Sequence, residues 1–372
     1  MILMKTVAAL LLKTGLPMPF AQSKPFELVE IDLDKPLEGE VLLRITGAGI
    51  CHSDLSIVNG SRPRPIPLIG GHEGVGVVEE LGAGVKDLKI GDTVSIIFMP
   101  PCGECSQCLH GTPAYCSVGS AANVKGEMLR GGSRISFNGK PIHHYNGVSC
   151  YSQHMVLDRR SLIKIPSEIP VESAAIFGCA LLTGIGAVRN GAKVRSGASV
   201  GIWGLGGVGL AALIGAVIAK ASPIIAIDPV AMKRELALEM GADIAISPTE
   251  NVRDYVKNGV DFAIETVGRV DALKQAYEMT VRGGVVTTIG LPDPKDILGI
   301  PAASLVTEIK TLQGSYMGSG DPRKDIPAYV KLWQEGRLPV AKLISLARPM
   351  SEVNEAMDDL HGAQVVRQVI IP

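Results

Sequence analysis

Residues 198–228 read ASVGIWGLGGVGLAALIGAVIAKASPIIAID, and this pattern gives the first indication of the fold. Residues 199–203 form a short apolar run that predicts a buried strand, and residues 208–220 have the length and apolar character of a helix. The turn between them, residues 204–209, matches G-x-G-x-x-G, and a second apolar strand ends at Asp228, nineteen residues after the last glycine. This order of strand, glycine-rich turn, helix and strand predicts a dinucleotide-binding βαβ unit.

The glycine-rich turn is expected to bind the cofactor through Gly204, Gly206, Gly207, Val208 and Gly209. Gly204 permits a sharp turn, Gly206 lets the backbone approach a pyrophosphate, and Gly209 allows the helix to pack closely on the strand. The N-terminus of the helix then faces the phosphate charge. Asp228 should accept hydrogen bonds from the adenosine ribose, and because its carboxylate would repel a 2′-phosphate, the sequence favours NAD over NADP.

The sequence on either side of this unit indicates a second domain. Strand and helix runs alternate from about Arg195 to Ile289, which implies a parallel, doubly wound sheet. The residues before about 180 read as short strands punctuated by glycine and proline. After Gly314 we expect two helices, at 326–335 and 350–360, and a closing strand at 365–371. We therefore predict a catalytic domain at 1–180, an inserted nucleotide-binding domain at 181–318 and a return to the catalytic domain at 319–372.

The composition is that of a compact globular protein, since 46% of the 372 residues are hydrophobic and 20% are charged. The net charge of −1 gives no electrostatic reason to expect nucleic acid or an anionic membrane as a partner. Residues 198–219 carry no charge and could span a bilayer by length, but six glycines favour a strand, a turn and a helix. The apolar run Thr6–Leu12 ends at Lys13 and is read as a first strand rather than a signal peptide. A soluble, cytoplasmic protein is therefore expected.

Four of the seven cysteines lie within fifteen residues, in the pattern C-x2-C-x2-C-x7-C formed by Cys102, Cys105, Cys108 and Cys116. Clustered cysteines in a long chain indicate a metal in a reducing compartment rather than a disulfide framework. Four thiolates close a tetrahedral shell, as in structural zinc sites, so a zinc lobe is expected at residues 98–117. An iron–sulfur cluster would also take four thiolates, but nothing else in the chain suggests electron transfer, so zinc is preferred.

A second set of metal ligands is suggested by Cys51 in GICHSD (49–54), His72 in GGHEG (70–74) and Cys179. Catalytic zinc commonly has three protein ligands and one open position, and two cysteines with one histidine are a known set. Spacing alone does not show that the three converge. Taken singly, Cys179 reads as a small buried hydrophobic residue and His72 as a loop histidine.

Taken together, these motifs resemble the zinc-containing alcohol dehydrogenases of the medium-chain dehydrogenase/reductase superfamily. The similarity runs from about Leu42 to Arg367 and is carried by residues 51–54, 71–74, the four-cysteine lobe, Gly178–Cys179 with Thr183–Gly184, and 204–209. The resemblance implies a GroES-like, β-rich catalytic domain and a Rossmann NAD-binding domain. It also implies that Cys51, His72 and Cys179 hold the catalytic zinc, which with the lobe makes two zinc ions per chain.

The resemblance assigns further roles. Asp54 would orient His72, Ser53 would hydrogen-bond the alcohol and begin the proton path, and Glu73 would be an alternate zinc ligand. His52 and Arg367 would contact the pyrophosphate, Lys233 the adenosine ribose and Thr183 the nicotinamide. The substrate pocket would be lined by Phe98, Tyr145, Asn146, Leu291 and Tyr316.

The implied activity is that of an NAD-dependent alcohol dehydrogenase, which oxidises a primary or secondary alcohol reversibly to an aldehyde or ketone. Zinc would lower the pKa of the bound alcohol, and the resulting alkoxide would release hydride to the nicotinamide. The expected partner is a small alcohol or aldehyde, and the long segment 117–145 resembles insertions of dimeric members, so a homodimer or homotetramer is expected.

Three positions depart from the family pattern. Ser56 stands where many members have a histidine that completes the proton relay, so either the relay would run through water or the catalytic pH optimum would shift upward. Ser120 stands where glutathione-dependent formaldehyde dehydrogenases carry an arginine, and their acidic pair is missing, which argues against that role. Asn146 places an amide in the pocket and suggests a polar or functionalised substrate.

Two alternatives to an alcohol dehydrogenase stay open. One is a polyol or thiol-adduct dehydrogenase of the same superfamily, and the other is a non-catalytic NAD-binding scaffold. Cys179 argues against a polyol dehydrogenase.

Overall fold

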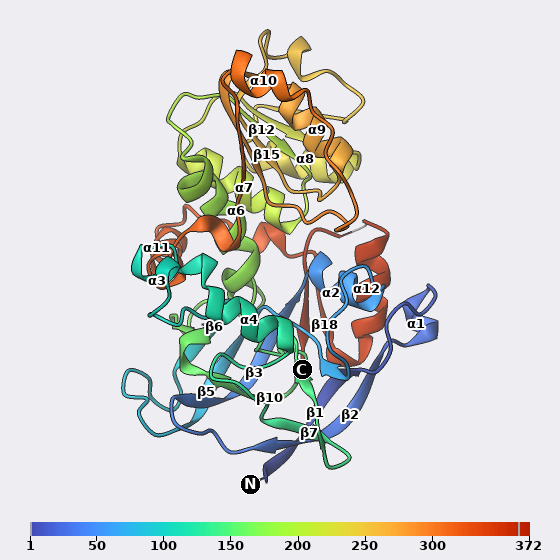
Figure 1. Ribbon diagram of the computed structural model, residues 1–372, viewed down its shortest axis with the longest axis vertical. Coiled ribbons are helices and arrows are strands. Elements are labelled where there is room, and N and C mark those ends of the chain that lie inside the picture. Colours follow the sequence, from blue (N-terminus) through green and yellow to red (C-terminus); the bar gives the residue numbers. More distant parts are fainter. Residues whose placement is uncertain (1, 364) are drawn as a thin grey trace. The chain divides into compact units, whose positions relative to one another are not determined.

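The computed structural model describes residues 2–363 and 365–372 (Figure 1). The chain divides into two compact units, one formed by Met1–Cys179 with Asp321–Pro372 and the other by Ala180–Gly320. The second unit is thus an insertion in the first. The mixture of a β-rich unit and a parallel α/β unit confirms the predicted fold class.

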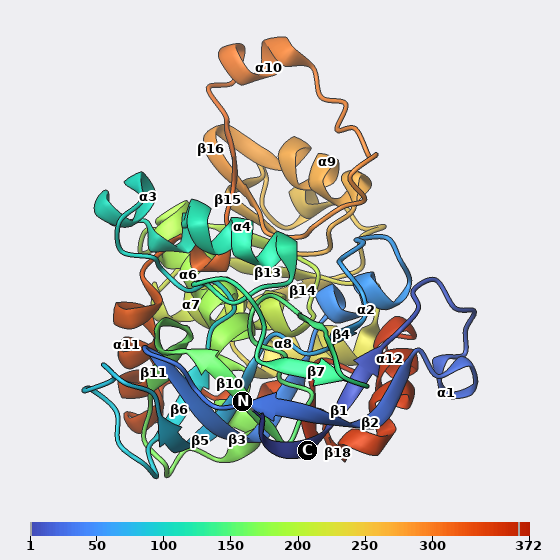
Figure 2. The ribbon, with the colours of Figure 1, turned by 60° about the horizontal axis from the view of Figure 1, so that its bottom comes forward.

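The first unit is built on two sheets. One is six-stranded with the order β8-β7-β2-β1-β4-β9, and Figure 2 shows β1, β2 and β7 side by side. Its strands are β1 (Ile2–Leu11), β2 (Phe26–Asp34), β4 (Leu68–Ile69), β7 (Ile135–Phe137), β8 (Lys140–Pro141) and β9 (His143–His144). The pairing of β1 with β2 is antiparallel over nearly their whole length, which confirms the residues after Lys5 as a strand.

The other sheet of this unit is seven-stranded, with the order β11-β6-β5-β3-β19-β18 and β10 also paired to β3. Its strands are β3 (Glu40–Ile50), β5 (Gly74–Leu81), β6 (Thr93–Ile96), β10 (His154–Asp158), β11 (Leu162–Lys164), β18 (Leu346–Pro349) and β19 (Gln368–Ile371). β3 is almost entirely buried, as its run of apolar residues requires. Because β19 pairs antiparallel with β3, the C-terminal segment completes the sheet of the first unit.

Short helices connect these strands and carry much of the candidate site. They are α1 (Phe20–Ser23), α2 (His52–Val58), α3 (Ser106–Leu109), α4 (Ser117–Lys125), α5 (Val171–Ala174), α11 (Pro322–Gln334) and α12 (Val353–His361). The helix expected at 326–335 begins four residues earlier than predicted, because Asp321 accepts a hydrogen bond from the backbone N–H of Arg323 and Pro322 occupies the first turn. The closing strand is shorter than predicted and begins at Gln368.

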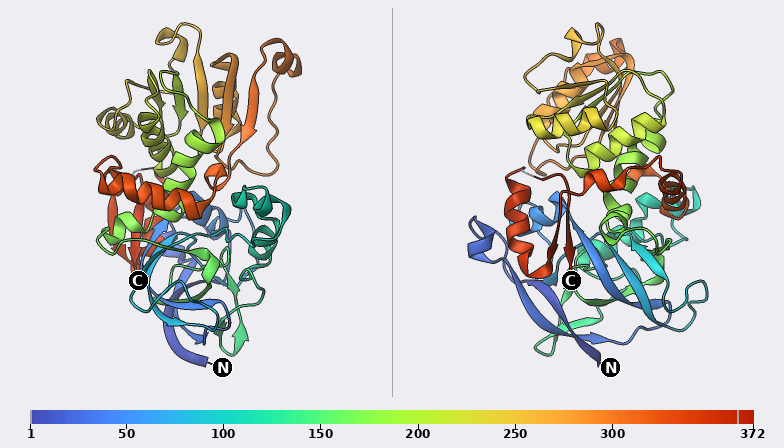
Figure 3. Two further views of the ribbon diagram at one scale, coloured as in Figure 1. Left: turned by 90° about the vertical axis from the view of Figure 1, so that its left-hand side faces the viewer. Right: turned by 180° about the vertical axis from the view of Figure 1, so that it is seen from behind.

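The second unit is a doubly wound parallel sheet with the order β14-β13-β12-β15-β16-β17 (Figure 3). Its strands are β12 (Val200–Trp203), β13 (Ile224–Ile227), β14 (Ile244–Ile246), β15 (Val260–Glu265), β16 (Thr280–Thr288) and β17 (Thr311–Gly314), and its helices are α6 (Leu182–Gly186), α7 (Gly207–Ile218), α8 (Ala231–Glu239), α9 (Val270–Glu278) and α10 (Ala302–Thr307). Counted along the chain, this order is 3-2-1-4-5-6, the order of dinucleotide-binding folds. β12 and β13 are wholly buried, as expected of central parallel strands.

Two apolar stretches could be mistaken for membrane spans. Residues 198–219 form β12, the glycine-rich turn and α7, which confirms the strand, turn and helix predicted there. The helical run Val171–Ala192 is long and apolar enough to cross a membrane, but 89% of its most apolar window is buried inside the structure. Such burial is typical of a core helix in a globular protein.

Candidate active site and zinc centres

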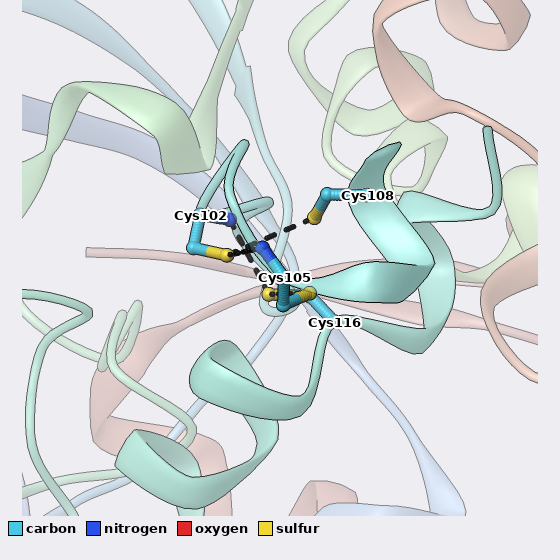
Figure 4. Close-up of side chains that lie close together, drawn as sticks. All are labelled: Cys102, Cys105, Cys108 and Cys116. Atoms are coloured by element: carbon cyan, nitrogen blue, oxygen red, sulfur yellow. Dashed lines mark hydrogen bonds between the residues drawn. The ribbon is translucent and has the colours of Figure 1, made fainter. Parts of the chain in front are cut away.

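The four clustered cysteines form one metal-binding lobe (Figure 4). The sulfur atoms of Cys102, Cys105, Cys108 and Cys116 all lie within 4.8 Å of one another, and Figure 4 shows them turned toward a common centre. Two pairs, Cys102 with Cys108 and Cys105 with Cys116, have sulfur–sulfur distances of 3.9 Å, far longer than a disulfide bond. The lobe therefore has the donor set and spacing of a four-thiolate zinc site.

Backbone N–H groups around the lobe favour thiolates. Cys116 is the N-cap of α4, and its sulfur accepts hydrogen bonds from the N–H groups of Gly119 and Cys102 at 3.3 Å. The sulfur of Cys102 accepts from the N–H of Cys105 at 3.2 Å. Backbone N–H groups of Cys108 and Ser117 lower the pKa of the Cys105 thiol to about 6. Burial raises the pKa of the Cys108 and Cys116 thiols, so the backbone N–H groups favour the thiolate most clearly at Cys105.

A second cluster brings Cys51, His72 and Cys179 together, with their ligand atoms within 4.8 Å of one another. The sulfur of Cys179 lies 3.5 Å from Nε2 of His72. A hydrogen bond from Cys179, then the charges of Arg367 and His72, hold the pKa of Cys51 well below its ordinary value although burial opposes this. Three converging ligands leave one of the four tetrahedral positions of a zinc ion open, as in catalytic zinc sites.

The end of β3 and the start of α2 place Cys51. The strand ends at Ile50, and Cys51 is the N-cap of α2, with its N–H donating to Oδ2 of Asp54 at 2.9 Å. The other oxygen of Asp54, Oδ1, lies 3.1 Å from Nδ1 of His72. Because Asp54 engages Nδ1, the Nε2 atom of His72 is the one that faces the cysteines.

Cys179 lies in an unusual turn of the backbone. Residues Phe177–Leu181 form one turn of π-helix, a rare conformation that is often found at functional sites. A Cβ atom added to Gly178 would overlap the carbonyl oxygen of Ile96, so only glycine lets this turn approach β6. The motif Gly178–Cys179 was predicted, but the reason for its glycine was not visible in the sequence.

Arg367 and Glu73 form a buried ion pair behind this cluster. Nε of Arg367 lies 3.4 Å from Oε1 of Glu73, and Nη1 donates to the carbonyl of Ile50 at 2.7 Å. Burial raises the pKa of Glu73, and Arg367 acts in the opposite direction. Arg367 was expected to contact a pyrophosphate; the structure places it 4% exposed beside Glu73, an arrangement that the sequence did not indicate.

Two of the predicted pocket residues pack against His72, one of the three clustered ligands. The rings of Phe98 and Tyr145 meet His72 edge-on, with centroids 5.2 and 5.5 Å from that of the imidazole. The hydroxyl of Tyr145 also donates to the carbonyl of Ser53 at 2.9 Å. Asn146 follows Tyr145, is buried and has a positive φ of 49°. Leu291 and Tyr316, the remaining predicted pocket residues, belong to the second unit.

Two further residues position the site and were not predicted. Asn123 of α4 is buried and donates from Nδ2 to the carbonyl of Phe98 at 2.7 Å. Arg160 donates from Nη1 to the carbonyl of Cys102 at 3.2 Å, and its Nε and Nη2 atoms contact both oxygens of Asp158. These contacts join segments 25 and 58 residues apart, so no local sequence signal could have revealed them.

The glycine-rich turn of the second unit has the geometry of a dinucleotide loop. Gly204 has a φ of +89°, and a Cβ added to Gly209 would overlap the carbonyl oxygen of Gly204. An added Cβ at Gly206 would have no atom of the described residues within 4 Å, so this side of the turn is open. α7 begins at Gly207, directly after the turn. The loop therefore combines an open backbone with a helix N-terminus, as phosphate binding requires.

Asp228 lies directly after β13 and holds the loop. Its Oδ2 accepts from the N–H of Leu205 and its Oδ1 from that of Val230, both at 2.8 Å. Each oxygen keeps a lone pair for a further donor. Of the other predicted cofactor residues, Lys233 is buried in α8, where burial lowers its pKa, Thr183 is buried in α6, and His52 is exposed on α2.

The family of the chain follows from comparisons with known proteins. Residues 37–167 match the model of the alcohol dehydrogenase GroES-like domain, and residues 207–335 match that of zinc-binding dehydrogenases. A provisionally named alcohol dehydrogenase D of Mycobacterium tuberculosis is 36% identical over 99% of this chain and 100% of its own. The S-(hydroxymethyl)glutathione dehydrogenase of Synechocystis is 37% identical over 96% of this chain and 100% of its own.

A solved structure agrees with these matches. Benzyl alcohol dehydrogenase from Acinetobacter calcoaceticus is 31% identical, covers 99% of each chain and superposes with a TM-score of 0.91. The two cysteine-containing clusters described above provide the zinc ligands that the family requires. The chain therefore belongs to the zinc-containing alcohol dehydrogenases of the medium-chain dehydrogenase/reductase superfamily.

Proposed function

We propose that the chain oxidises primary alcohols to aldehydes, reversibly and with NAD, at the centre formed by Cys51, His72 and Cys179. The observation that carries this proposal is the convergence of these three ligand atoms within 4.8 Å beside two aromatic rings. A chain that used zinc only for its structure would not need these three ligands with an open fourth position, because the four-cysteine lobe already offers a structural zinc site. A non-catalytic scaffold would have no use for it.

Zinc bound there supplies a Lewis acid that lowers the pKa of an alcohol hydroxyl, and NAD supplies the hydride acceptor. The residues of the chain do the rest. Asp54 holds the tautomer of His72 in which Nε2 is free to bind a metal. Ser53, two residues from Cys51, takes the alcohol proton and passes it to water, because Ser56 donates to the carbonyl of His52 and offers no imidazole for a relay.

The preference for NAD rests on Asp228. Its carboxylate is fixed by the N–H groups of Leu205 and Val230, so it cannot turn away from a nucleotide at the loop without losing both bonds. A fixed carboxylate accepts hydrogen bonds from the ribose hydroxyls of NAD, and its charge repels the 2′-phosphate of NADP. The family and the geometry of the loop support a dinucleotide cofactor, and Asp228 supports NAD rather than NADP.

Benzylic and allylic alcohols are the proposed substrates. The rings of Phe98 and Tyr145 stand beside His72 and offer flat, apolar packing to an unsaturated group next to the reacting carbon. The similarity to a benzyl alcohol dehydrogenase is consistent with this. Oxidation of S-(hydroxymethyl)glutathione is the second candidate, because a relative of that name is 37% identical, although Ser120 offers no cation for a glutathione carboxylate.

A substrate panel tests the proposal. NADH absorbance is followed after mixing the two-zinc protein with NAD and benzyl, cinnamyl, ethyl and polyol alcohols, and with formaldehyde plus glutathione. We expect kcat/KM to be about tenfold higher for benzyl alcohol than for ethanol, the effect of one favourable aromatic contact. Turnover only with formaldehyde and glutathione would establish the second candidate, and no turnover with any of these would refute both.

A homodimer is proposed from the edge of the sheet in the second unit, where β17 pairs only with β16 among the described strands. β17 is the last strand of its sheet, and exposed strand edges are ready to pair with another chain. Nearby residues expose unusual apolar surface: Val306 is 79% exposed and Ile309 62% exposed. Light scattering coupled to size exclusion should give twice the 39.1 kDa mass of one chain. A monomer would refute the proposal, and a tetramer would show a second interface.

A further inference from the structure

Tyr145 contacts two functional parts of the first unit that are far apart in sequence. Its hydroxyl donates to the backbone carbonyl of Ser53 at 2.9 Å, across 92 positions of the chain. Its ring packs edge-on against His72, with centroids 5.5 Å apart and an interplanar angle of 85°. The residue is only 3% exposed, so both contacts are shielded from water. Tyr145 therefore joins the expected proton acceptor to a zinc ligand.

The backbone of Tyr145 is itself anchored close to His72. Its N–H donates to the hydroxyl of Ser149 at 2.9 Å, and that hydroxyl donates to the carbonyl of Ile69 at 2.8 Å. Ile69 ends β4, three residues before His72. Because these bonds fix the backbone of Tyr145 next to the strand that leads to His72, the phenol hydroxyl has a fixed place relative to the zinc ligands.

The partner of this hydroxyl is a short helix that depends on outside contacts. α2 has seven residues, and helices of that length are not stable by themselves. Its first turn carries three groups of the site, since Cys51 is the N-cap and Ser53 and Asp54 follow. Asp54 ties the turn to Cys51 and His72, but neither of these bonds involves Ser53. The hydroxyl of Ser53 lies 3.9 Å from the sulfur of Cys51, within the same turn, and the hydroxyl of Tyr145 bonds the Ser53 carbonyl from outside α2.

We propose that Tyr145 is a positioning residue that holds the first turn of α2, and with it the hydroxyl of Ser53, in place for proton transfer. The role acts through Ser53, so it is separate from zinc binding and from cofactor binding. Its kinetic consequence rests on the proposed alcohol oxidation, whereas its structural consequence does not. Loss of one buried hydrogen bond of this kind corresponds to about a three- to tenfold effect.

The variant Tyr145→Phe tests the proposal, because it removes the hydroxyl and keeps the ring on His72. Tyr277→Phe is the matched control, since it removes another buried tyrosine hydroxyl, bonded to Ser304 at 2.6 Å in the second unit. We expect Tyr145→Phe to keep two zinc ions and the wild-type KM for NAD, and to lower kcat for the alcohol about three- to tenfold. The solvent deuterium isotope effect on kcat should rise, because proton transfer becomes slower.

Hydrogen–deuterium exchange provides a readout that needs no activity. The peptide containing α2, residues 52–58, should exchange about three- to tenfold faster in Tyr145→Phe than in the wild type or in Tyr277→Phe. If no alcohol is oxidised by the wild type, the proposed function fails, and this exchange still decides the role of Tyr145. Unchanged exchange would overturn the positioning role, and so would a loss of kcat that follows a loss of zinc.

Discussion

Asp54 lies directly behind His72, with Oδ1 of the carboxylate 3.1 Å from Nδ1 of the imidazole and both side chains buried. The same carboxylate caps α2 through the N–H of Cys51. Although burial opposes protonation of His72, the charges of Asp54 and Cys51 raise its pKa well above the ordinary value. One side chain therefore sets the orientation of one zinc ligand and the backbone position of another.

Replacing Asp54 by asparagine is expected to weaken the catalytic zinc site selectively. The amide cannot hold the Nδ1–H tautomer as a carboxylate does, and partners of this kind change metal affinity or activity by about 10- to 100-fold. Zinc affinity and kcat should both fall within that range, while the zinc of the lobe is retained. Competition with a chromogenic chelator measures both sites, and equal weakening of the two would contradict the assignment.

Replacing Gly178 by alanine is expected to remove the catalytic zinc. The added methyl would overlap the carbonyl of Ile96 and displace the π-helical turn that carries Cys179. Zinc content should fall from two ions per chain to one. Gly299→Ala is the control, because an added Cβ there has no atom of the described residues within 4 Å. A Gly178→Ala protein with two zinc ions would show that the turn tolerates the methyl.

Replacing Asp228 by asparagine should relax the choice of cofactor. The amide removes the charge that repels a 2′-phosphate and can keep only one of the two bonds to Leu205 and Val230. We expect KM for NAD to rise about tenfold and the NAD/NADP ratio of kcat/KM to fall about 10- to 100-fold. Asp243→Asn is the matched control, since Asp243 accepts from the N–H of Ile224 at the opposite end of β13. An unchanged ratio would refute the role of Asp228.

Because the imidazole of His144 is buried, we expect the folded chain to become less stable in mild acid. His144 is 1% exposed, and burial followed by the charges of Arg134 and His143 lowers its pKa from 6.5 to about 3. Below pH 6.5 this histidine binds a proton in the unfolded chain but stays neutral in the folded chain. The free energy of unfolding therefore decreases as the pH falls toward 3. The free energy of unfolding should lose about 1.4 kcal/mol for each pH unit in this window.

The variant His144→Phe checks this pH dependence. Urea unfolding between pH 6.5 and 4.5 should show a flatter decline for His144→Phe than for the wild type, whereas the exposed His110→Gln should leave the decline unchanged. Parallel declines in all three proteins would mean that other groups cause the acid sensitivity. Urea unfolding measures stability alone, so the comparison does not depend on catalytic activity.

Much of the architecture could be predicted from local patterns. The strand, glycine turn and helix of residues 198–220 are specified by adjacent residues, and they recur as β12, the turn and α7 with ends shifted by one or two positions. The four cysteines of the lobe lie within fifteen positions, so their spacing alone indicates a metal. β16 begins at Thr280, whereas the apolar run 284–289 predicts a strand that starts four residues later, because residues 281–283 are partly or fully exposed and lack an apolar run.

The parts that were not predicted depend on contacts between distant segments. The clash that requires Gly178 involves Ile96, the partner of Glu73 is Arg367, and the hydroxyl of Tyr145 bonds to Ser53. No periodicity or short motif records which carbonyl or carboxylate a side chain will meet 80 or more positions away. The resemblance indicated that several of these residues matter, but the structure is needed to see how they act.

The proposed zinc centre of Cys51, His72 and Cys179 predicts that the variant Cys179→Ala loses both the catalytic zinc and the oxidation of alcohol. Zinc content and NADH formation from benzyl alcohol are measured together on the wild type and on Cys179→Ala. Cys150→Ala is the control for loss of a buried thiol, because Cys150 is fully buried and belongs to neither ligand cluster. We expect one zinc ion and no measurable turnover in Cys179→Ala, and two zinc ions with wild-type kcat in Cys150→Ala. A Cys179→Ala protein that keeps two zinc ions and full turnover would show that alcohol is not oxidised at this centre.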